Sequence, residues 1–172
     1  MNLDISLLGW VHTAGCLCAL ATGAIVLAGL KGTRQHRFFG RLYLIAMLVT
    51  NLTALAIYRR GVFYFPHWFA VAALIAISIG FACVRLRWPR AYWRNAHLTC
   101  MVASYYVLVG GGVNEVYLRV NLLHALAPDV LHSPLVSSTH SAVMLIFVIL
   151  IAYFNVRYRS GRARQPTRQV TG

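Results

Sequence analysis

Five long apolar segments constrain the fold of this chain more than any other feature of its sequence. A helix that crosses the hydrocarbon core of a bilayer needs about 20 mostly apolar residues. The composition agrees, because 59% of the 172 residues are hydrophobic and only 11% are charged, with a mean hydropathy of +0.65. A soluble domain of this length needs more charge to cover its surface. The expected helices are residues 5–30, 39–58, 66–86, 95–118 and 134–156.

These segments predict a single all-α domain, an integral membrane bundle of about five transmembrane helices over residues 1–158. Residues 159–172 are rich in Arg, Gln and Thr, and we expect a basic, disordered cytoplasmic tail there. The first segment lacks a basic leader and a small-residue cleavage site, so it is expected to be a retained helix rather than a signal peptide.

Basic residues predict how the chain is oriented. Thirteen of the 16 Lys and Arg residues fall between the first and second segments, between the third and fourth, or after the fifth. The other side holds Arg59, Arg60 and Arg119, together with Asp4, Glu115 and Asp129. Positive-inside bias then places the N-terminus outside and the C-terminus in the cytoplasm. The net charge of +13 is explained by topology and calls for no nucleic acid. We expect a multi-pass protein of the bacterial inner membrane, with the lipid bilayer as its first partner.

Small residues recur at helical spacing in the first segment. Gly15, Ala19 and Gly23 lie on the same face as His12 and Cys16. Small residues let two helices approach closely. This stripe therefore predicts that the face packs against a neighbouring helix and carries His12 inward, with Cys16 as a packing residue.

Ionisable residues inside a membrane are energetically costly, and each suggests a function. His12 and His140 both lie about 10 Å below the outer end of their segments, counted at the helical rise. Asn51 lies at a similar depth, whereas His67 and Glu115 are nearer the outer surface. If the bundle is compact, these residues converge on one polar layer in its outer half.

Two imidazoles at matched depth on different helices suit the axial ligation of a b-type haem. We expect His12 and His140 to be these ligands, with His67, Asn51 and Glu115 as further cofactor-binding residues. A transition metal bound by His12, His67, His140 and Glu115 is the second interpretation. A proton relay or a quinone site is the third. Ordinary hydrogen bonding between helices accounts for such histidines equally well.

Motifs of soluble enzymes are absent. The chain has no Walker loop, dinucleotide glycine fingerprint, HExxH or nucleophile elbow. The leading hypothesis is a small membrane redox or cofactor-binding protein that works with a membrane electron-transfer partner or a quinone. Its rivals are a proton- or metal-linked transporter and a structural or accessory subunit that binds no cofactor.

Short polar signatures near the segment ends resemble a known family. They are His12, Lys31-Gly32-Thr33, His36-Arg37, Gly40-Arg41-Leu42-Tyr43, Pro66-His67, His97 ahead of Met101, Ser104-Tyr105-Tyr106 and Asn114-Glu115. Over about residues 8–120 the chain resembles the bacterial predicted membrane proteins called domain of unknown function 2306. That resemblance implies a membrane protein and names no activity.

Histidines near both membrane faces are also similar in arrangement to di-haem cytochrome b561-like bundles. This architectural likeness implies a second, inner site, for which His36 and His97 are the candidates. His36 is expected in a loop rather than in a helix, which departs from that architecture.

Overall fold

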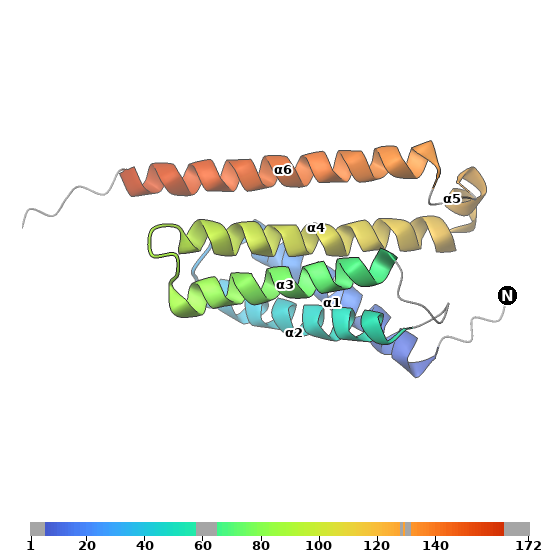
Figure 1. Cartoon of the computed structure of the whole chain (residues 1–172), viewed down its shortest axis with the longest axis horizontal. Helices are drawn as coiled ribbons and strands as arrows, with labels where there is room; N and C mark the ends of the chain where they lie inside the picture. The colour runs from blue at the N-terminus through green and yellow to red at the C-terminus, as the bar shows by residue number, and fades with distance from the viewer. Residues whose placement is uncertain (1–5, 58–64, 128, 130–131, 164–172) are drawn as a thin grey trace, which may run out of the picture.

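The computed structural model describes residues 6–57, 65–127, 129 and 132–163. This part of the chain is helical and contains no strand. The helices are α1 (Leu7–Ala28), α2 (Arg34–Ala56), α3 (Phe65–Leu86), α4 (Trp93–Arg119), the short α5 (Asn121–Leu126) and α6 (Pro134–Ala163). All except α5 contain a stretch that is long and apolar enough to span a membrane. The all-α fold with five candidate spans is confirmed (Figure 1).

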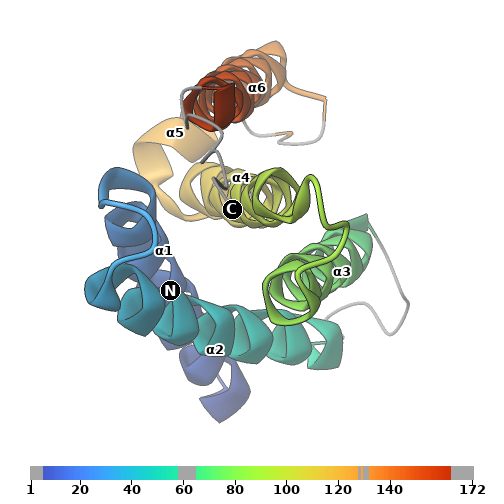
Figure 2. The same ribbon diagram turned by 90° about the vertical axis from the view of Figure 1, so that its left-hand side faces the viewer.

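Four of the long helices form a closed ring (Figure 2). Helix α1 packs on α2, α2 on α3, α3 on α4, and α4 packs back on α1. Helices α1 and α3 therefore lie on one diagonal of the ring, and α2 and α4 lie on the other. In the described part of the chain, α6 packs along α4, on the outside of the ring. The fold is a four-helix bundle with one helix added to its surface.

The bundle has two chemically different ends. We call the end that holds the α1–α2 loop, the α3–α4 loop and the last turns of α6 the basic end (the left side of Figure 1). Lys31, Arg34, Arg90 and Arg157 are among its cations. The opposite end holds the first turns of α1, α3 and α6 and the whole of α5. That the basic end faces the cytoplasm stays a prediction.

The stripe of small residues on α1 packs as expected. Gly15, Ala19 and Gly23 are buried, and Ala19 has no exposed surface. A Cβ atom added at Gly15 would lie 2.8 Å from Thr50 Oγ1 of α2, and one added at Gly23 would overlap the ring of Tyr105 of α4. The prediction that this face meets neighbouring helices is confirmed, because only small residues leave room for α2 and α4.

Helix α2 begins earlier than the apolar segment indicated. Thr33 is its N-cap, and its hydroxyl accepts a hydrogen bond from the main-chain N–H of His36 at 3.1 Å. A threonine cap starts a helix before the apolar residues do. The expectation that His36 lies in a loop is therefore corrected: His36 belongs to the first turn of α2.

Two further differences lie in the second half of the chain. Helix α6 continues to Ala163, so it includes residues 159–163 of the expected tail; residues 164–172 lie outside the described residues. Arginine is a good helix former, which lets the helix continue beyond the apolar stretch. Helix α5 lies in the connection between α4 and α6, outside the five expected segments.

Candidate functional site

Each helix of the ring carries one histidine in its first two turns. His12 is on α1 and His67 on α3, and both lie in the half of the bundle next to the opposite end. His36 is on α2 and His97 on α4, and both lie near the basic end. Since α1 and α3 share one diagonal and α2 and α4 share the other, each end of the bundle has two histidines on diagonally opposite helices. We call these the two histidine pairs.

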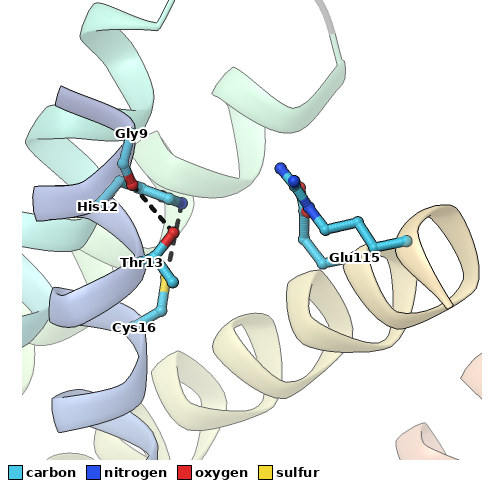
Figure 3. A network of polar contacts seen from close by, with 6 residues as sticks. Gly9, His12, Thr13, Cys16 and Glu115 are labelled. Carbon is cyan, nitrogen blue, oxygen red and sulfur yellow. Dashed lines mark hydrogen bonds and ion pairs between the residues drawn. The ribbon is translucent and has the colours of Figure 1, made fainter. Parts of the chain in front are cut away.

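His12 is fixed by α2. Its Nδ1 lies 3.0 Å from the main-chain oxygen of Thr50 and 3.1 Å from Thr53 Oγ1. A carbonyl oxygen only accepts, so Nδ1 of the neutral ring carries the proton and Nε2 keeps its lone pair. The thiol of Cys16, one turn further along α1, lies 3.5 Å from that Nε2 (Figure 3).

His97 has the same tautomer at the other end of the bundle. Its Nδ1 donates to the main-chain oxygen of Gly80 on α3, at 2.8 Å. A Cβ atom at Gly80 would lie 3.1 Å from Cys100 Cβ and would overlap the terminal methyl of Met101. Glycine at this position thus lets α3 and α4 approach closely enough for the bond. The Nε2 of His97 keeps its lone pair.

The other two histidines of the ring are also turned away from solvent. His67 is 2% exposed. In His36 the Nδ1 atom is buried and has no hydrogen-bond partner among the described residues. His36 interacts electrostatically with Lys31 and His97, and it lines a small hollow of about 30 Å³ beside the last turn of α1.

His140 lies outside the ring. Its Nε2 is 2.8 Å from the amide oxygen of Asn114 on α4, and its ring lies against Gly110. An amide oxygen accepts, so Nε2 of His140 carries the proton, the reverse of His12. The expected convergence of His12 and His140 on one cavity is not found, because α6 packs on the outer face of α4. A haem ligated by these two histidines does not fit this arrangement.

Asn51 and Glu115, which were expected in one polar layer, lie in different surroundings. Asn51 is buried, and its Nδ2 donates to the main-chain oxygen of Met47 in its own helix at 2.7 Å. Glu115 forms an ion pair with Arg119 one turn further along α4, and its side chain is 56% exposed. Figure 3 shows Glu115 on the side of α4 that faces α1, and it interacts electrostatically with Cys16.

The expected set of metal ligands is not assembled. Among the described residues, no group of three or more His, Cys, Asp and Glu side chains is placed to hold a metal ion. His140 bonds α4 from outside the ring, and Glu115 is paired with Arg119.

Sequence reasoning missed a polar cluster in the middle of the bundle. The hydroxyl of Tyr43 on α2 lies 2.8 Å from Ser104 Oγ on α4, and Tyr105 donates to the main-chain oxygen of Leu20 on α1 at 2.9 Å. The ring centres of Tyr43 and Tyr105 are 6.1 Å apart. A signal was present in the sequence, since Tyr43 follows His36 by two turns and Ser104 follows His97 by two turns. These side chains lie between the two histidine pairs.

Long apolar helices with costly polar groups turned inward define a helical membrane protein. A family model described as "Predicted membrane protein (DUF2306)" matches residues 9–153, and the chain belongs to this family. The match confirms the resemblance seen over residues 8–120 and extends it into α6. No curated protein and no solved structure matches the chain.

Proposed function

We propose that this membrane protein is a redox protein that binds b-type haem at both ends of its four-helix ring. The observation that carries the proposal is the placement of one histidine on each ring helix, in two diagonal pairs. Cofactor sites in helical bundles are built from side chains on facing helices, and a b-type haem can take one imidazole on each face of its iron. His36 and His97 would hold the haem at the basic end. His12 and His67 would hold the second haem, at the opposite end.

The tautomers of His12 and His97 support this assignment. Metal-ligating histidines almost always donate their second ring N–H to a carbonyl, a carboxylate or a water, which fixes the ring and leaves the other nitrogen for the metal. His12 does so to Thr50 and His97 to Gly80, in each case on a neighbouring helix. The buried, unpartnered Nδ1 of His36 also suits a ligand, because a buried polar atom without a partner is energetically costly.

Space for the macrocycle has to be opened between the helices. The hollow beside His36, about 30 Å³, is the size of one water molecule. Met47 and Met101 are the side chains best suited to move, because methionine is unbranched and adapts to irregular spaces. Met47 belongs to the central core of the ring, and Met101 packs against it.

A bound haem supplies one-electron chemistry, and the chain supplies the ligands and an apolar surrounding. Tyr43, Ser104 and Tyr105 lie between the two histidine pairs and hold α1, α2 and α4 at a fixed spacing. The electron partner in this proposal is a membrane redox protein or a quinone. The proposed location is the bacterial inner membrane, with the basic end in the cytoplasm.

The absorption spectrum of the full chain, purified in detergent from haem-supplied cells and combined with metal analysis, tests the proposal. We expect a Soret band whose intensity falls by about half in His97→Ala, because one of two sites is lost. The matched control is His140→Ala, which removes an intramembrane imidazole outside the ring and should leave the band unchanged. A colourless protein that takes up no added haem would overturn the proposal, and so would equal loss in His140→Ala. A colourless sample with bound metal would also overturn the haem proposal, because the protein would then bind a metal ion without the macrocycle.

A proton-linked transporter is the second candidate. The observation that favours it is the succession of polar groups through the ring, from His36 through the hydrogen-bonded pair of Tyr43 and Ser104 to Asn51 and His12. Such groups can pass protons when water joins them. Proton flux into vesicles that depends on Tyr43, in a colourless protein, would support transport. Neither colour nor flux would leave an accessory subunit as the remaining alternative.

A further inference from the structure

The positive charge of the basic end has no acidic partner among the described residues. Both ion pairs among the described residues, Arg119 with Glu115 and His132 with Asp129, lie at the opposite end. Asp4, the third acidic residue of the sequence, lies outside the described residues. Since the described part of the chain leaves this charge unbalanced, anions from outside the protein can bind at the basic end.

Lys31, in the loop after α1, brings this charge next to α6. Its Nζ donates to the main-chain oxygens of Val26, Leu27 and Gly29 at 2.8, 2.6 and 3.0 Å, and it lies 5.0 Å from the ring centre of Phe154 on α6. Burial, and then the charge of Arg157, lower the pKa of Lys31 below that of an ordinary lysine. The three N–H groups of Lys31 are all used, so it contributes charge to a ligand rather than a hydrogen bond.

Among the described residues, the guanidinium of Arg157 makes a single hydrogen bond. Its Nη1 donates to the hydroxyl of Tyr153 at 2.8 Å, whereas a guanidinium has five N–H groups. Arg157 and Tyr153 form one end of a shallow, open groove on the surface of α6, which continues over Ile149, Ala152 and Val156. These residues follow helical spacing, and the small side chain of Ala152 leaves a notch between its larger neighbours. The apolar walls are exposed, with Ile149 57% and Val156 63% accessible.

We propose that this groove is a specific site for an anionic phospholipid, with one acyl chain along Ile149 and Val156 and the phosphate at Arg157. Arg157 is the first Lys or Arg of α6 and follows its apolar stretch, and basic residues at the end of a spanning stretch lie at the level of the headgroups. A guanidinium binds phosphate through two parallel hydrogen bonds. Phosphatidylcholine places the same apolar chains in the groove, but its choline group cancels the phosphate charge. The site does not depend on haem binding.

Native mass spectrometry of the full chain, released from detergent with equal amounts of phosphatidylglycerol and phosphatidylcholine, tests the site. We expect preferential retention of phosphatidylglycerol, reduced about fivefold in Arg157→Gln, the size expected for one basic residue near an anionic surface. Arg90→Gln is the matched control, because it removes the same charge from an exposed residue of the same end. It should retain the preference.

Ala152→Phe fills the notch without changing charge, and it should also lower retention of the lipid. Equal loss of preference in Arg90→Gln and Arg157→Gln would overturn the proposal in favour of diffuse attraction. Displacement of phosphatidylglycerol by an equal concentration of inorganic phosphate would overturn it too, because the groove would then have no part in binding. Lipid retention does not depend on whether the protein binds haem. The lipid proposal can therefore fail or succeed separately from the haem proposal.

Discussion

The Nδ1 atom of His97 on α4 donates to the main-chain oxygen of Gly80 on α3 at 2.8 Å, and the absence of a side chain at Gly80 makes that distance attainable. The same bond fixes the ring of His97 and leaves Nε2 with a lone pair. Helix packing and the chemistry of the candidate site therefore depend on one another at this point. Enlarging Gly80 should disturb both.

Gly80→Val should lower the stability of the bundle by about 1–3 kcal/mol, the usual cost of overpacking. The added atoms would meet Cys100 and Met101 on α4, and α3 would have to move away from His97. Thermal unfolding in detergent measures the effect. Gly111→Val is the control, because nothing lies within 4 Å of a Cβ atom at Gly111. Equal destabilisation by both variants would contradict the close approach at Gly80.

Ala19→Leu should destabilise the protein by about 1–3 kcal/mol for the same reason. Ala19 is completely buried within the ring, and the larger side chain would force α1 away from its neighbours. Leu17→Ala, at a position 63% exposed on the same helix, should have little effect on the unfolding temperature. A variant of Ala19 with unchanged stability would mean that this face of α1 meets lipid.

The hydrogen bond between Tyr43 and Ser104 should contribute measurably to the contact between α2 and α4. Interhelical hydrogen bonds of this kind show coupling energies of about 0.5–2 kcal/mol in membrane bundles. The measurement is a double-mutant cycle with Tyr43→Phe, Ser104→Ala and the combined variant, followed by unfolding in detergent. Strictly additive effects would show that the two hydroxyls contribute independently.

Reporter fusions test the orientation that positive charge predicts. A reporter after Gly172 should lie in the cytoplasm, and one inserted beside Asp129 should lie outside, because basic loops are retained on the cytoplasmic side. A tail reporter found outside would reverse the assignment of both ends.

The sequence was sufficient to predict the helices but not their lateral neighbours. Hydrophobic length determines which segments span, and the small residues at Gly15 and Ala19 indicated which face of α1 packs. Depth along a helix, however, says nothing about which helix lies beside it. His140 matched His12 in depth, yet α6 packs on the outside of α4, so the two imidazoles face different partners.

His36 shows the opposite case, because the sequence beside it already indicates its place in a helix. Thr33 three residues before His36 is a typical N-cap pattern, and it places His36 in the first turn of α2. With that cap, each of the first four long helices carries one histidine. The diagonal relation between these helices still required the structure, because it depends on how the ring closes between α4 and α1.

The haem-to-polypeptide ratio of His36→Ala and His67→Ala tests the central claim most directly. Each variant removes one imidazole from a different diagonal pair, so each should lose the haem of its own end and keep the other. The combined variant should bind none. Loss of the same haem in both variants, or full retention in both, would contradict the arrangement of the histidines as two separate ligand pairs.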